Sequence, residues 1–259
     1  MANATREQDQ AAETSATQGA GATAPPPSPT HELRLLATHT LHILQKDLRQ
    51  EWRSREIVYT MALFAALLVM IFSFAFIEQG EPMSGVAAGI LWVALAFAGT
   101  LALGRYFERE READTITALL LSPVNRAAIY LAKLLGIVIF MLITELVLLP
   151  LLIVLFEIEI TAPALLGALL LLGTIGFAAV GSLFAAGLMR SSSREVLLAV
   201  LTFPIVLPVI IAGAKGTAAL ITSPADLPAA ITWLKLMLAF DAIFVVLSLW
   251  AFGPLVSSE

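Results

Sequence analysis

The chain has 259 residues, of which 59% are hydrophobic and 14% are charged, and its formal net charge is −5. Soluble domains are about 45–50% apolar and about 25% charged, so this composition excludes an ordinary soluble domain and predicts a protein that crosses a membrane several times. There is no cysteine, which excludes disulfides, thiolate metal ligands and a cysteine nucleophile.

The segment before the first apolar run has two parts. Residues 1–30 are rich in Ala, Thr, Gln and Gly and end in a proline-rich stretch, so we expect a disordered tail. Residues 31–56 have apolar residues on one helical stripe and basic residues away from it. The stripe consists of Ala37, Leu41, Leu44, Leu48 and Trp52. This pattern predicts an amphipathic helix in the membrane interface, with a soluble helix packed on a partner as the alternative.

Six apolar runs follow, and each is long enough to cross a bilayer, which needs about 20 apolar residues. They cover residues 57–77, 83–104, 127–156, 163–189, 196–214 and 232–252. We therefore expect an all-α membrane protein with six transmembrane helices over residues 57–253 and a short tail over residues 254–259. Pro150, Pro204 and Pro208 lie inside these runs, and we expect each to kink its helix.

Two segments among the runs have unusual compositions. The fourth run has small residues at regular spacing, which let another helix approach closely. They are Gly167, Gly173, Gly176, Gly181 and Gly187, with Ala178, Ser182 and Ala186 at four-residue spacing. We favour packing within the chain over a dimer seam. Residues 215–231 are weakly polar, and we expect short re-entrant helices there and no full span.

Basic residues define the orientation. Lys and Arg gather before the first run, between the second and third, and between the fourth and fifth, whereas the alternate loops hold only Lys215. The positive-inside rule therefore predicts that both termini are cytoplasmic. Lys133 lies near the start of the third run, and we expect it to extend its ammonium group to the membrane surface.

The longest charged interruption between apolar runs is Arg105–Pro123. Its first part is too charged for hydrocarbon, and its second part has the i, i+3, i+4 spacing of a short amphipathic helix that ends at a proline. Because this segment is predicted to be cytoplasmic, we interpret it as the docking point for a partner subunit. The candidate docking residues are Arg105, Glu110, Asp114, Ile116, Leu119, Leu120, Ser122 and Pro123.

Two carboxyl groups fall inside predicted spans, Glu145 and Asp241. Such a group costs several kcal/mol in hydrocarbon, so each should face the bundle interior or a wet cavity. One interpretation is a substrate path or a proton-linked step. The other, which we favour, is a protonated carboxyl that is hydrogen-bonded to a neighbour such as Thr144 or Ser248.

No catalytic or metal site is predicted. All three histidines precede the first run, which leaves no imidazole in the spans to bind a metal, ligate a haem iron or serve a catalytic triad. The phosphate-binding pattern G-x-x-x-x-G-K-[ST] is absent. Active transport would therefore need a separate ATP-binding subunit.

Several stretches, taken together in order and spacing, carry a family resemblance. They are Gly89-Ile-Leu-Trp-Val93, Arg105-Tyr-Phe107, Leu119-Leu-Leu-Ser-Pro123, Ala132-Lys133 and the proline-containing run Phe203–Gly213. With these, the chain resembles the CcmB family, the permease subunit of the haem exporter of cytochrome c maturation in the bacterial inner membrane. The resemblance extends over roughly residues 33–252. One departure is Ala113-Asp114, where the family usually has Asp-Gly.

The resemblance implies an ABC-2 type permease with an N-terminal elbow helix at residues 31–55 and a coupling helix at residues 112–121. It also implies a homodimer in membrane lipid, two copies of a CcmA-like ATP-binding subunit, a CcmC-like haem-handling membrane protein and a small CcmD-like subunit, with no nucleic acid. No cofactor would bind this chain directly. ATP would act through the partner, and haem would be the transported substrate.

Three alternatives stay open. The first is an ABC-2 permease for another substrate, such as a drug or a lipid-linked glycan. The second is a membrane scaffold that transports nothing. The third, an intramembrane enzyme, is the least favoured because the sequence offers no catalytic set.

Overall fold

The computed structural model describes residues 29–78, 81–82, 84–112, 124–189, 191, 193–222 and 224–257. The chain divides into two compact units, Met1–Leu35 and Leu36–Glu259. Of the first unit only residues 29–35, the start of a helix, are described. The second unit contains the rest of that helix and all the other described elements.

The described elements are mostly long helices. In chain order they are α2 (Pro29–Ser54), α3 (Glu56–Ala75), β1 (Ile77–Glu78), β2 (Glu81–Pro82), α4 (Ser84–Glu112), α6 (Arg126–Phe156), α7 (Pro163–Gly187), α8 (Arg194–Ile221) and α9 (Leu227–Ser257). Strands β1 and β2 form a small antiparallel pair between α3 and α4. Six of the helices in the described ranges, α3, α4, α6, α7, α8 and α9, are long and apolar enough to cross a membrane. This confirms the predicted all-α, six-span class.

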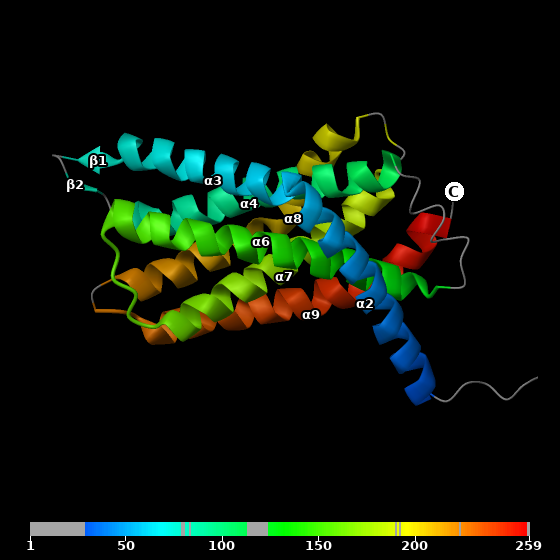
Figure 1. Cartoon of the computed structure of the whole chain (residues 1–259). Coiled ribbons are helices and arrows are strands. Elements are labelled where there is room, and N and C mark those ends of the chain that lie inside the picture. The colour runs from blue at the N-terminus through cyan, green and yellow to red at the C-terminus, as the bar shows by residue number, and fades with distance from the viewer. Residues whose placement is uncertain are drawn as a thin grey trace, which may run out of the picture. The chain divides into compact units, whose positions relative to one another are not determined.

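Helices α4 and α7 form the centre of the bundle. Each packs against four other helices, α4 against α3, α6, α7 and α8, and α7 against α4, α6, α8 and α9. Their apolar windows are 67% and 61% buried within the protein, whereas those of α3 and α9 are 28% buried. The outer helices therefore leave most of their apolar surface for lipid. The six long helices run side by side, and the part of α2 in this unit crosses them obliquely (Figure 1).

Local sequence explains where several helices begin. Asn125 precedes α6, and its Oδ1 accepts a hydrogen bond from the Ala127 amide at 2.9 Å. Asp226 precedes α9, and its Oδ1 accepts one from the Ala229 amide at 3.0 Å. Pro163 is at the first turn of α7, where its missing amide donor costs nothing. The first two side chains satisfy amides that the helix itself leaves without partners.

The expectation of re-entrant helices at residues 215–231 is wrong. Helix α8 continues to Ile221, and α9 begins only six residues later, at Leu227. The polar character of this segment serves packing on α4. Thr217 accepts a hydrogen bond from Trp92 Nε1 at 3.0 Å, and a Cβ at Gly213 would lie 2.3 Å from the Trp92 ring. Small and hydroxyl-bearing residues therefore form the contact face of a continuous helix.

Several of the small residues of α7 pack within the chain, as predicted. A Cβ at Gly173 would lie 2.1 Å from the Trp92 ring, and one at Gly181 would lie 2.2 Å from Leu103. Both neighbours belong to α4. Because no larger residue fits at these two positions without displacing α4, this side of α7 is used for packing inside the bundle.

Candidate functional site: a buried charge cluster joining α2, α4 and α6

The face of α2 that packs on the bundle is partly acidic. Thr40, Ile43, Asp47 and Glu51 are buried and recur every three or four residues, so they share one helical face. Trp52, by contrast, is 78% exposed. Part of the predicted apolar stripe therefore points away from the protein, whereas the acidic side chains point into the protein interior.

Lys133 of α6 lies at the centre of this contact. Its Nζ is 2.7 Å from Asp47 Oδ2 and 2.9 Å from Glu110 Oε1, and its side chain is fully buried. The Tyr106 hydroxyl donates to Asp47 Oδ2 at 2.5 Å, and the Tyr106 ring centroid lies 4.8 Å from Lys133 Nζ. The prediction that Lys133 reaches the membrane surface is wrong, because carboxylates from α2 and α4 neutralise the buried ammonium where it stands.

Lys46 completes a set of two cations and two carboxylates. Its Nζ lies 3.0 Å from Asp47 Oδ1 and 3.3 Å from Glu110 Oε1. Burial alone would raise the pKa of Asp47, but the charge of Lys133 and hydrogen bonds from Lys133 and Tyr106 outweigh it, so that pKa is lowered. Partial burial likewise opposes the charged form of Lys46, but Asp47 and Glu110 raise its pKa. Both Asp47 and Lys46 are therefore charged at neutral pH.

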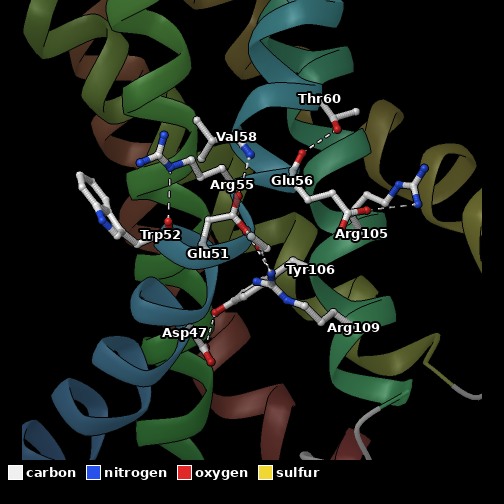
Figure 2. Close-up of polar contacts among 11 residues, drawn as sticks. Asp47, Glu51, Trp52, Arg55, Glu56, Val58, Thr60, Arg105, Tyr106 and Arg109 are labelled. Carbon is white, nitrogen blue, oxygen red and sulfur yellow. Dashed lines mark hydrogen bonds and ion pairs between the residues drawn. The ribbon is translucent and has the colours of Figure 1, made fainter.

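Glu51 binds two other helices at once (Figure 2). Its Oε2 is 3.0 Å from Arg109 Nη1 on α4, and its Oε1 accepts a hydrogen bond from the Val58 amide in the first turn of α3 at 3.0 Å. Arg55, the single residue between α2 and α3, has a positive φ of 55°. The first amides of α3 have no acceptor within their own helix. Glu51, just before the sharp connection at Arg55, accepts the hydrogen bond of one of them.

Other ion pairs lie at nearby helix ends. Arg194 at the start of α8 is 2.5 Å from Glu108 of α4. Arg105 of α4 lies 3.9 Å from Glu56 at the start of α3 (Figure 2). These contacts gather charges from three helices, α3, α4 and α8, near the C-terminal end of α4, next to the predicted docking segment.

Helices α4 and α6 flank that segment. Of the candidate docking residues, Arg105 and Glu110 are on α4, and Glu110 belongs to the buried cluster. The others lie outside the described residues: Asp114, Ile116, Leu119, Leu120, Ser122 and Pro123. Glu110 precedes the end of α4 by two residues, and Lys133 lies in the early part of α6. Both helices that leave the segment are therefore ionically joined to α2.

The two intramembrane carboxyl groups are buried in the bundle, as expected. Glu145 accepts a hydrogen bond from Thr174 of α7. Asp241 packs against Gly176 of the same helix, and its carboxyl oxygens have no hydrogen-bond partner within the described ranges. The predicted hydrogen-bond partners of these carboxyl groups, Thr144 and Ser248, are wrong. The Thr144 hydroxyl donates to the Phe140 carbonyl, and the Ser248 hydroxyl donates to the Ala179 carbonyl.

The predicted proline positions are helical. Pro150 lies inside α6, and Pro204 and Pro208 lie inside α8. Each interrupts one backbone hydrogen bond, and the kinks stay predictions. In the part of the chain that the structure describes, no group of three or more His, Asp or Glu residues could hold a metal ion.

Comparison with known proteins identifies the family. The family model described as "CcmB protein" matches residues 38–258. The chain belongs to the CcmB family. The matched range of this CcmB chain includes Asp47, Glu110 and Lys133 and all six membrane helices.

Two curated relatives are both named Heme exporter protein B. The one from Rhodobacter capsulatus is 29% identical over 173 residues, which cover 67% of this CcmB chain and 79% of the relative. The one from Pseudomonas aeruginosa is 28% identical over 199 residues, which cover 76% of this chain and 88% of the relative.

Sequence reasoning missed Asp47, Glu51 and Tyr106 and misplaced Lys133. One signal was available. Asp47 and Glu51 are acidic residues at i and i+4 on a helix whose other charges are largely basic, and Lys133 is an isolated cation in an apolar run. Acidic residues on one helix and an isolated cation in another apolar segment are candidates for a buried ion pair.

Proposed function

We propose that this CcmB chain is the membrane-spanning permease subunit of an ABC transporter that exports haem for c-type cytochrome biogenesis. The match of the family model over residues 38–258 carries the proposal. The names of the two relatives, each of which is covered over at least 79% of its length, support haem as the substrate. The transporter resides in the bacterial inner membrane, with both termini of this chain in the cytoplasm.

In this function, a separate CcmA-like subunit binds and hydrolyses ATP and docks on residues 112–121. The charge cluster supports a route for the resulting motion. Glu110 and Lys133 stand on the two helices that flank the docking segment, and both contact Asp47 or its neighbour Lys46 on α2. A displacement of the docking segment therefore moves α4, α6 and α2 together.

The complete transporter contains two copies of this chain and two of the ATP-binding subunit, with CcmC-like and CcmD-like membrane proteins. Glu145 and Asp241 have no assigned step in transport. Their burial against α7 is compatible with helix packing by neutral carboxyl groups, since such groups cost less in hydrocarbon than carboxylates.

Leu119→Asp tests the docking segment. The substitution places a charge on the apolar stripe that should be buried against the ATP-binding subunit, so we expect the tagged variant to insert normally and to lose this subunit in a pull-down from membranes. Thr117→Asp adds the same charge off the stripe and serves as the matched control. Normal co-purification of the ATP-binding subunit with Leu119→Asp would refute the assignment.

The composition of the wild-type pull-down separates the three candidate functions. An ATP-binding subunit together with a haem-handling membrane protein supports haem export for cytochrome c maturation. An ATP-binding subunit alone favours an ABC-2 permease for another substrate. Absence of any ATP-binding subunit from an intact membrane preparation favours the scaffold.

A further inference from the structure

An open groove of about 380 Å³ lies among α3, α4 and α8. Its volume is within the range of about 300–1,000 Å³ that is typical of small-molecule sites. Helix α4 forms the floor, and α3 and α8, which both pack on α4, form the walls. Most of the lining is apolar, including Phe64, Phe97, Leu198 and Phe203. The Phe97 and Phe203 ring centroids are 5.3 Å apart, so these two rings close the groove between α4 and α8.

One end of the groove has two opposite charges, Arg105 near the end of α4 and Glu195 in the first turn of α8. Glu195 is exposed. Half of the Arg105 side chain is exposed, and it meets Glu56 only at 3.9 Å, which is beyond hydrogen-bond distance. The guanidinium can therefore still donate to a phosphate, with which it forms paired hydrogen bonds. The Arg194–Glu108 ion pair at 2.5 Å holds the start of α8 against α4 and keeps Glu195 at this end.

We propose that this groove is a binding site for one phosphatidylethanolamine molecule. An acyl chain occupies the apolar part, the phosphate binds Arg105, and the primary ammonium binds Glu195. The paired charges select this occupant, because a headgroup with one anion and one cation matches both residues. A purely anionic lipid leaves Glu195 facing negative charge, and so does haem, whose two propionates have no accompanying cation at that edge.

Gly104 makes the site testable. It lines the groove, and a Cβ built there meets no heavy atom within 4 Å. A leucine side chain at this position would therefore extend into the groove, and leucine suits a helix better than glycine does. Gly89 is on the same helix, has the same open surroundings and does not line the groove. Gly89→Leu is therefore the matched control for Gly104→Leu.

The experiment is native mass spectrometry of the full chain after reconstitution in bilayers of equal phosphatidylethanolamine and phosphatidylglycerol and extraction in mild detergent. We expect wild type and Gly89→Leu to retain one phosphatidylethanolamine, and Gly104→Leu to lose it. Undiminished retention by a folded Gly104→Leu variant, or equal retention of both lipids by wild type, overturns the proposal.

Two charge variants test the headgroup contacts without filling the groove. Arg105→Gln should lower retention of both lipids by roughly tenfold to a hundredfold, the scale of one hydrogen bond to a charged group. Glu195→Gln should lower phosphatidylethanolamine retention, because the ammonium loses its anionic partner, and raise phosphatidylglycerol retention, because the repulsion from Glu195 is removed. Unchanged retention and preference in both variants refute the headgroup assignment even if Gly104→Leu fails to fold.

Haem is the alternative occupant, and it is tested in the same preparations. Addition of haem should give the same visible absorbance titration with wild type and Gly104→Leu. A haem signal that Gly104→Leu removes and Gly89→Leu retains would overturn the lipid assignment. Failure of the lipid proposal is distinguishable from failure of the proposed transport function. The family match and the pull-down of the ATP-binding subunit do not depend on whether a lipid occupies this groove.

Discussion

Replacement of Lys133 by methionine removes the central cation of the buried cluster and keeps a side chain of similar length. Asp47 and Glu110 then remain buried, with Lys46 as the only cation that the described contacts place beside them. Lys46 is 43% exposed, so its charge is partly screened by water. Helix α2 should therefore lose much of its attachment to α4 and α6.

The structure sets the magnitude. Two unit charges 2.8 Å apart attract by about 6 kcal/mol at an effective dielectric constant of about 20, and Lys133 makes two such pairs, at 2.7 and 2.9 Å. Desolvation of several kcal/mol per ion offsets most of this attraction. Removal of one partner from a buried pair leaves the desolvation cost without compensation, and typically costs about 3–5 kcal/mol. For a chain of this size, that corresponds to a fall in Tm of roughly 6–20 °C.

Thermal unfolding of the purified protein in detergent, followed by tryptophan fluorescence, measures this fall. Limited trypsin digestion at the exposed Arg53 and Arg55 reports separately on release of α2, because local opening precedes cleavage. Lys46→Met is the control, and as a half-exposed partner it should cost no more than about 1 kcal/mol.

A compensated variant separates charge from packing. Lys133→Met combined with Asp47→Asn and Glu110→Gln removes both stranded carboxylates and should recover more than half of the lost Tm. If Lys133→Met unfolds and is cleaved no more readily than Lys46→Met, the cluster does not hold α2 and the reasoning is refuted.

Two further predictions concern packing and pH. Gly173→Ala should lower the free energy of unfolding by about 1–3 kcal/mol, because its Cβ would lie 2.1 Å from the Trp92 ring. Gly167→Ala is the control and should have no such effect, since a Cβ there meets nothing within 4 Å. Equal Tm values for the two variants would contradict the packing of α7 on α4. The contribution of Asp47 should be complete above the ordinary aspartate pKa of 3.8 and fall as the pH drops through its lowered folded-state pKa. That of Lys46 should be complete below 10.5 and fall as the pH rises through its raised pKa. Tm measured from pH 3 to pH 11 should thus have a plateau between these limits, and an acid limb that Asp47→Asn does not reduce would count against the first assignment.

The six spans were predictable because hydrocarbon imposes a simple rule. A span needs about 20 apolar residues and must satisfy its backbone hydrogen bonds internally, so composition and length suffice to locate helices. The prediction failed at residues 215–231, whose weakly polar composition indicated short re-entrant helices, although Thr217 lies in the continuous helix α8. The role of Thr217 is visible only with Trp92, its hydrogen-bond donor, which lies 125 positions away in the sequence.

The candidate site was harder to predict for the same reason. Glu110 was selected because it lies in a charged segment, and it does belong to the cluster. Lys133 was assigned to the membrane surface, since a lone cation near the end of a span usually extends to water. Its partners Asp47 and Glu110 come from two other helices, and a helical stripe describes one helix at a time. Charge pairing between segments, unlike periodicity, depends on the tertiary fold.

The Asp47–Lys133 pair also imposes an order on biosynthesis. The two residues are 86 positions apart in the chain, so at about 5–20 residues per second the ribosome delivers the lysine roughly 4–17 s after the aspartate. During that interval α2 lacks the cation with which Asp47 later pairs. Its carboxylates therefore have the lowest free energy when they are hydrated at the membrane surface. The final packing of α2 against the bundle must therefore wait for insertion of the third span. A nascent chain arrested before residue 133 should have an α2 that is still open to proteases.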